Sequence, residues 1–174
     1  RKMEKGLCSK ALVKYFRIFK IVAIKGVLLI NSTENLRLRN SMADWVNQFD
    51  WELWFTGTFK PDEAYRDTIK TKRAFKRFIG DLTKNFNKTD IEYFLAIERF
   101  YNSDDCHCHA LLNGLEGLSY RQIGETWRDR FGREKVEGYQ KDKGANYYLT
   151  KYVTKDLCDW DLRINKTKSH KLIF

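Results

Sequence analysis

The sequence predicts an α+β fold in which helices flank a central antiparallel β-sheet. Segments rich in β-branched and aromatic residues alternate with segments of helical apolar spacing, in the order strand, helix, strand, strand, helix, strand, helix. Two of these strands are separated only by a short turn-forming cluster, which is typical of an antiparallel hairpin. The 174 residues are 43% hydrophobic and 15% aromatic, enough for one domain with its own core.

The sheet-forming region begins with a strand and a helix. Residues 52–60 (ELWFTGTFK) are rich in β-branched and aromatic side chains, which predicts a strand. We expect a helix from Pro61 to about residue 86, with Asp62 as a candidate N-cap. Its apolar face is expected to contain residues that recur at helical spacing, namely Tyr65, Ile69, Phe75, Phe78, Ile79, Leu82 and Phe86.

A hairpin is predicted next. Residues 91–100 (IEYFLAIERF) predict a largely buried strand, and 106–113 (CHCHALLN) predict the returning strand after the turn-forming cluster 101–105 (YNSDD). Ser119 and Gln122 then have the spacing of a capping box, which predicts a helix to about residue 131.

The C-terminal part is predicted to contain one more strand and one more helix. The strand is short and covers 133–140, and the helix covers 143–157. Residues 158–174 show no clear pattern of either kind.

Residues 1–40 are expected to form a basic, partly helical N-terminal arm, and residues 41–174 a single domain. Eight of the first thirty residues are basic and one is acidic, so the arm holds +7 of the net charge of +10. An amphipathic helix is expected at about 9–24, either packed on the domain or lying along nucleic acid. The polar stretch 31–40 is the expected joint between the arm and the domain.

The composition limits the classes of partner. A net charge of +10 favours polyanions such as nucleic acid. No stretch approaches the roughly 18 apolar residues that span a bilayer, so no membrane association is expected. The four cysteines are expected to be reduced thiols, since a chain with this many aromatic residues needs no disulfides, and this favours the cytoplasm.

A histidine pair is the first candidate for chemistry. His107 and His109 are two apart in a predicted strand, so both imidazoles project from one face while Cys108 projects from the other. Across the hairpin Glu98 lies opposite one histidine or the other, depending on the register. Two imidazoles and a carboxylate suit a catalytic Mg²⁺ or Mn²⁺ ion. The plain alternatives are two surface histidines and an ion pair between Glu98 and Arg99, whereas the alternation of ligands disfavours a zinc knuckle.

The last predicted helix is the second candidate. Tyr148 and Tyr152 share one helix face with Lys151 and Lys155. A nearby cation favours the phenolate form of tyrosine and also binds phosphate. The alternative is an amphipathic helix whose tyrosines are half-buried with solvated hydroxyls.

Three motifs in this order resemble those of the HUH endonucleases, and among them the rolling-circle replication initiator (Rep) proteins of plasmids and phages. The strand FTGTF is similar to the first motif, HCHALLNG to the second, and YLTKYVTK to the double-tyrosine form of the third. Cys108 departs from the usual apolar residue between the histidines. The resemblance spans roughly residues 50–157 and implies a ferredoxin-like or RRM-like palm as the core of the HUH endonuclease domain.

The resemblance also implies a reaction. His107, His109 and Glu98 would hold the metal ion, and Tyr148 would attack the scissile phosphate to leave a 5′-phosphotyrosine and a free 3′-hydroxyl. Lys151 would stabilise charge on the phosphate or lower the pKa of the tyrosine. Tyr152 is either a second nucleophile or a residue that packs against the sheet.

The expected partner is single-stranded DNA or an origin hairpin. Lys155 and the basic stretch Lys72, Arg73, Lys76 and Arg77 are candidate contacts, although the same stretch also fits a solvated helix face. No GxxxxGK[ST] motif occurs, so a host or separate helicase and polymerase are expected. Homodimer formation stays open, as do a relaxase or transposase with the same chemistry and a non-catalytic nucleic-acid-binding module.

Overall fold

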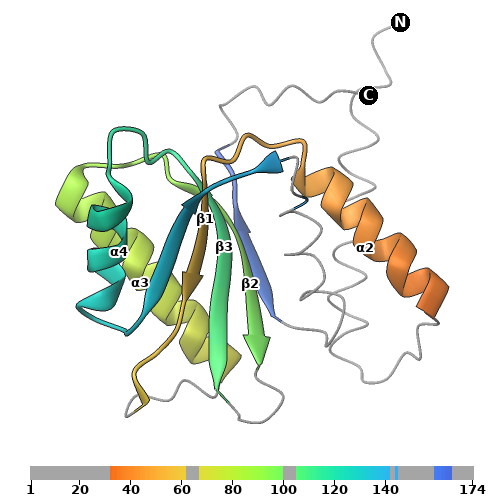
Figure 1. The fold of residues 1–174 in the computed structure, drawn as a ribbon, viewed down its shortest axis with the longest axis horizontal. Helices are drawn as coiled ribbons and strands as arrows, with labels where there is room; N and C mark the ends of the chain where they lie inside the picture. Colours follow the sequence, from red (N-terminus) through yellow and green to blue (C-terminus); the bar gives the residue numbers. More distant parts are fainter. Residues whose placement is uncertain (1–31, 62–66, 100–104, 142–143, 145–158, 166–174) are drawn as a thin grey trace, which may run out of the picture. The chain divides into compact units, whose positions relative to one another are not determined.

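The computed structural model describes residues 32–61, 67–99, 105–141, 144 and 159–165 (Figure 1). The chain divides into two units, residues 1–34 and 35–174, and the sheet and the helices packed on it lie in the second. The helix expected at 9–24 and the helix expected at 143–157 fall outside the described residues, apart from Gly144. Both therefore stay predictions, as does the division into an arm and a domain.

Five antiparallel strands form one sheet, which confirms the predicted α+β class. They are β1 (Leu53–Gly57), β2 (Glu92–Arg99), β3 (Cys106–Asn113), β4 (Glu134–Gly138) and β5 (Trp160–Arg163). The order across the sheet is β4-β1-β3-β2-β5. The hairpin strands β2 and β3 are therefore neighbours, as predicted, and β3 is the central strand.

Two helices cover one face of this sheet, α3 (Thr68–Phe86) and α4 (Tyr120–Arg128) (Figure 1). The apolar face predicted for the first of them is largely buried, with Phe75, Phe78 and Leu82 fully enclosed. In α4 the capping box is present, since Ser119 accepts from the backbone N–H of Gln122 and the Gln122 side chain accepts from the backbone N–H of Ser119. These helices and the facing strand residues form the main hydrophobic core.

Three boundaries differ from the sequence prediction. Helix α3 begins at Thr68 with Asp67 as its N-cap, so the start at Pro61 with Asp62 as cap is wrong. Helix α2 (Ser32–Val46) occupies the stretch expected to be a polar joint, because its polar residues are solvated while Met42, Ala43 and Val46 are buried. Strand β5 lies in a segment without a predicted element.

The alternation of side chains along β3 separates the core from the histidines. Cys106, Cys108 and Ala110 belong to the core under α3 and α4. His107 and His109 project from the other face, where His109 is 7% exposed. The strand therefore presents its imidazoles on the face opposite to α3 and α4.

Candidate metal centre

Three potential metal ligands meet at one end of the sheet. The hairpin register places Glu98 directly opposite His107, which selects one of the two registers that the sequence allowed. The carboxylate also reaches the second histidine, since Glu98 Oε2 lies 3.2 Å from His109 Nε2. One ligand atom from each of Glu98, His107 and His109 lies within 4.8 Å of the other two. The structure thus brings together the predicted metal ligands.

The spacing and the chemistry of this group fit a divalent cation. Metal–ligand bonds of about 2.1 Å to an octahedral Mg²⁺ place neighbouring ligand atoms about 3 Å apart. The 3.2 Å separation of Glu98 Oε2 and His109 Nε2 matches such a pair. Two nitrogen donors and one oxygen donor leave further coordination positions for water or substrate oxygen, as a catalytic ion requires. The residues present therefore fit a metal, and its identity is a matter for the proposal below.

Burial keeps His107 in the form that binds metals. Desolvation lowers the pKa of its imidazole, and the neighbouring His109 lowers it further, whereas Glu98 and Asp105 act in the opposite direction. The two imidazole centroids lie 6.2 Å apart. A neutral imidazole has the free nitrogen lone pair that coordination needs.

The cysteines of the same strand take no part in this group. Cys106 and Cys108 are 1% and 0% exposed in the core on the other face of the sheet. Burial raises the pKa of the Cys108 thiol well above its usual value, which favours the protonated form rather than a thiolate ligand. The structure therefore agrees with the prediction that the motif is not a zinc knuckle.

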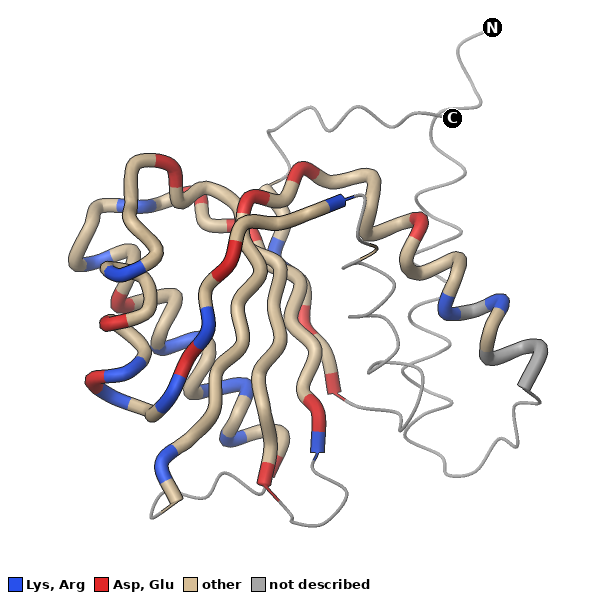
Figure 2. Tube along the Cα trace, viewed as in Figure 1, with Lys and Arg blue, Asp and Glu red and all other residues tan. Residues whose placement is uncertain are grey.

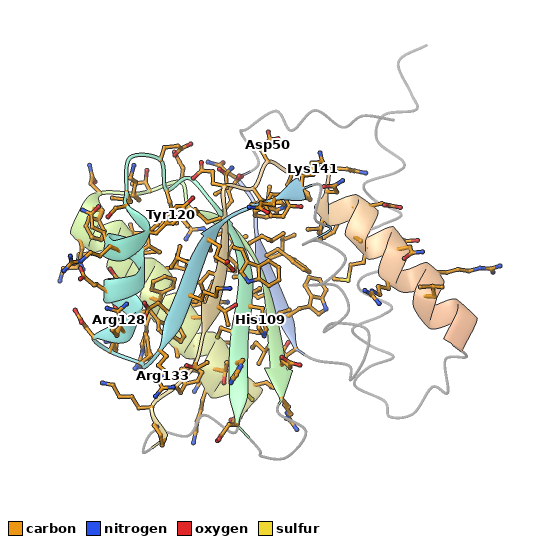
Figure 3. The ribbon with its side chains drawn as sticks, in the orientation of Figure 1. Asp50, His109, Tyr120, Arg128, Arg133 and Lys141 are labelled. Atoms are coloured by element: carbon orange, nitrogen blue, oxygen red, sulfur yellow. The ribbon has the colours of Figure 1, made fainter. Side chains whose placement is uncertain are left out.

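A hydroxyl from the neighbouring strand supports the second histidine. Thr56 pairs with His109 across β1 and β3, and its Oγ1 lies 3.2 Å from His109 Nδ1. The indole N–H of Trp54 donates to the same hydroxyl oxygen at 3.0 Å. The Trp54 ring also contacts the imidazole, with centroids 6.1 Å apart. His109 (labelled in Figure 3) is thus held at both ring nitrogens, one by Thr56 and the other by Glu98.

Comparison with known protein families gives a match over residues 52–157. The matching family is described as replication-associated protein, of the ORF2 type. The match extends over more than half of the chain, from the start of the sheet to the predicted tyrosine helix. The chain belongs to this family. No curated protein and no solved structure matches it.

Membership of this replication-associated protein family supports a role in the initiation of DNA replication, consistent with a rolling-circle initiator. All three metal-ligand candidates and both tyrosines lie within the matched residues. Among the described helices of this family member, none has the length and apolarity needed to cross a membrane.

The predicted tyrosine site lies outside the described residues. Tyr148, Lys151, Tyr152 and Lys155 all fall in 145–158, so their roles stay predictions. The next described residue, Asp159, is placed clearly, because its carbonyl oxygen accepts from the backbone N–H of Ile97 at 2.9 Å. Ile97 precedes the candidate ligand Glu98. The chain that follows the tyrosines therefore joins the sheet beside the metal-ligand group.

The basic stretch of α3 lies on the opposite face of the sheet from the histidines. Lys72 Nζ donates to Asp159 Oδ1 at 2.7 Å and to the carbonyl oxygen of Trp160 at 3.2 Å. Lys76 forms an ion pair with Asp161 at 2.8 Å. Arg73 and Arg77 are exposed. The structure does not bring these four cations to the metal-ligand group, and their contact with DNA stays a prediction.

Proposed function

We propose that this protein is a metal-dependent, site-specific endonuclease and strand transferase that nicks single-stranded DNA to initiate rolling-circle replication. The observation that supports this most directly is the group formed by Glu98, His107 and His109 on the two central hairpin strands, inside the region that matches a replication-associated family. Reduced thiols and the expected partners agree with work in the cytoplasm of a host cell.

Glu98, His107 and His109 would hold Mg²⁺ or Mn²⁺ at the end of the sheet. When bound, the ion would polarise a non-bridging oxygen of the scissile phosphate and so make phosphorus more electrophilic. Glu98 supplies the negative charge that favours a divalent cation, and the imidazoles bind in their neutral form. Thr56 fixes the orientation of the His109 ring.

Tyr148 is the proposed nucleophile. Its phenolic oxygen forms a bond to phosphorus while the bond from phosphorus to the 3′-oxygen breaks, and the leaving oxygen takes up a proton to become a 3′-hydroxyl. The product is a 5′-phosphotyrosine, which conserves the energy of the phosphodiester for rejoining. Lys151 would lower the pKa of the attacking tyrosine or stabilise charge on the phosphate.

Tyr152 is proposed as a second nucleophile that closes the cycle, with packing against the sheet as its alternative role. A helical spacing of four residues would place both phenols on the same face. Lys155 is a candidate contact to the DNA backbone. The free 3′-hydroxyl would serve a host or separate polymerase, and a host or separate helicase would unwind the duplex.

The test uses end-labelled single-stranded DNA from the protein's own origin with Mn²⁺, analysed on a denaturing gel. We expect a covalent protein–DNA adduct that disappears on chelation and in Tyr148→Phe. His109→Ala should lose the adduct as well, while Tyr152→Phe should still form the first adduct. Cleavage that persists in Tyr148→Phe contradicts the nucleophile assignment. Absence of any adduct, with tight DNA binding retained, favours the non-catalytic binding module.

A further inference from the structure

A second feature lies at the same end of the sheet as the histidines. The chain that leaves β1 and the chain that enters β4 enclose a cavity of about 440 Å³, lined by Thr58, Phe59, Lys60, Pro61, Arg128, Gly132 and Arg133. We call it the β1–β4 pocket. Figure 3 shows Arg128 and Arg133 at the end of the sheet where His109 lies, away from Tyr120 and Lys141.

The side chains that line the β1–β4 pocket include three cations and no acid. Arg128 is neutralised by a two-pronged ion pair with Glu134. Lys60 and Arg133 are exposed, and neither has an ion-pair partner in the part of the chain that the structure describes. The pocket thus keeps about two uncompensated positive charges, and such a cavity is suited to an anion.

Charge separates this pocket from another surface cavity. The cavity between α3 and α4 is lined by the acidic residues Asp81, Glu125 and Asp129, with Arg130 paired to Asp81. The tube view colours the β1 and β4 ends with lysine and arginine, whereas acidic residues mark the lower ends of β2 and β3 (Figure 2). A polyanion that reaches the metal-ligand group is therefore attracted from the β1–β4 side.

The backbone that carries the two free cations is held tightly. Thr58 N–H donates to the carbonyl oxygen of Arg133 at 2.8 Å, and Lys60 N–H donates to that of Phe131 at 2.8 Å. The indole of Trp127 donates to the Thr58 carbonyl at 3.1 Å. At Gly132, where φ is +151°, a Cβ atom would lie 2.6 Å from the Thr58 carbonyl oxygen. Lys60 and Arg133 are thus presented from a preorganised turn.

The register gives the distance from the pocket to the metal-ligand group. Thr56 pairs with His109, and Thr58 N–H bonds to Arg133 two residues further along and one strand further out. Two strand spacings of about 4.8 Å and two residue rises of about 3.4 Å separate the Cα atoms of Arg133 and His109 by roughly 12 Å. A single DNA strand covers that separation with a few nucleotides.

We propose that the β1–β4 pocket binds a backbone phosphate of the single-stranded DNA, a few nucleotides from the phosphate that is cut. The proposal rests on the proposed function, since it places the same DNA strand across both sites. Arg133 offers a planar fork for two phosphate oxygens, and Lys60 adds a compact positive charge. The contact would fix the register of the strand relative to the metal without reading its sequence.

The test compares two variants that lose the same charge. Lys60→Ala/Arg133→Ala removes the free cations of the pocket, and Arg73→Ala/Arg77→Ala removes two exposed cations on α3. Both are made in the full-length chain with Tyr148→Phe, and the binding of fluorescein-labelled single-stranded DNA is measured in EDTA over a range of NaCl concentrations. Neither cleavage nor a metal ion enters this measurement.

We expect the pocket variant to bind roughly five- to tenfold more weakly at low salt, with the slope of log K against log [NaCl] reduced by about 0.7 for each lost phosphate contact. The α3 variant should change less. Equal affinity and slope for the pocket variant and its parent overturn the proposal, as does an equal or larger loss in the α3 variant. If the alanine variant unfolds, Lys60→Gln/Arg133→Gln takes its place.

The outcomes also separate this proposal from the proposed function. If the wild-type protein forms the covalent adduct but the pocket variant binds DNA like its parent, the nuclease stands and the pocket proposal falls. If no adduct forms with any origin DNA but the pocket variant loses affinity, the pocket binds DNA in a non-catalytic module. The two failures are therefore distinguishable.

Discussion

Thr56 Oγ1 lies 3.2 Å from Nδ1 of His109, while Nε2 of the same ring lies 3.2 Å from the carboxylate of Glu98. The Thr56 oxygen already accepts from the indole of Trp54, which can only donate. When Nε2 coordinates a metal, Nδ1 must hold the proton and donates it to Thr56. The hydroxyl therefore favours the tautomer and the ring orientation that metal binding requires.

Removing this hydroxyl should weaken metal binding without removing a ligand. Thr56→Val keeps the shape of the side chain, and we expect Mn²⁺ affinity to fall about 10- to 100-fold because the ring loses its support. Thr56→Ser keeps the hydroxyl and should remain close to the wild type. Titration calorimetry, or the electron paramagnetic resonance signal of free Mn²⁺, measures this directly. Unchanged affinity in Thr56→Val would contradict the role assigned to the hydroxyl.

Two glycines give a matched pair for the packing of the core. A Cβ at Gly57 would lie 2.6 Å from the ring of Trp127, which is fully buried and cannot move aside. Gly57→Ala should therefore destabilise the fold by about 1–3 kcal/mol. Gly80 lies within α3 with nothing within 4 Å of the new atom, and Gly80→Ala should stabilise by about 0.5–1 kcal/mol. Urea unfolding followed by circular dichroism measures both; a neutral Gly57→Ala would show that β1 can shift.

Lys72 links α3 to the start of β5, so its loss should destabilise the edge of the sheet. Its side chain is 19% exposed and bonds to both Asp159 and the carbonyl of Trp160. We expect Lys72→Met to lower the free energy of unfolding by about 1–2 kcal/mol, since it leaves two acceptors without their donor. Lys76→Met is the control: its side chain is 52% exposed, and its ion pair with Asp161 should contribute less than about 1 kcal/mol. Equal losses in the two variants would refute the distinction.

The hairpin and the histidine pair could be predicted because both depend on local pattern. Alternation of side chains defines β3, and a short polar cluster separates it from β2. The start of α3 could not be predicted in the same way, since Asp62 and Asp67 are equally good caps and the packing of the helix decides between them. Strand β5 owes its existence to pairing with β2, more than sixty residues earlier, and its four residues carry too little pattern alone.

The site shows the same division between local and long-range information. The sequence supplied Glu98, His107 and His109 but left their register open, because the turn decides it. Thr56 escaped notice, since a hydroxyl in a strand carries no signal until the pairing of β1 with β3 is known. For the lysines of α3 the sequence gives the charge but not the acidic partners, which come from β5 and the residue before it.

The thiols of β3 should resist alkylation in the folded protein. Cys106 and Cys108 are buried, and desolvation raises the pKa of both, so little thiolate is present near neutral pH. We expect the peptide that contains residues 106–108 to remain unmodified by iodoacetamide at pH 8 and to react fully in urea. Mass spectrometry of the digested protein measures this, and rapid modification of Cys108 under native conditions would contradict its burial.

The central place of β3 makes its length more important than most of its side chains. Because neighbouring residues point to opposite faces, one inserted or deleted residue before His107 would turn the imidazoles into the core and expose the thiols. The hydrophobic core and the metal-ligand group would then fail together, on both sides of the sheet. Insertions and deletions compatible with this fold therefore belong in the connections between strands, while β3 itself can change only by substitution.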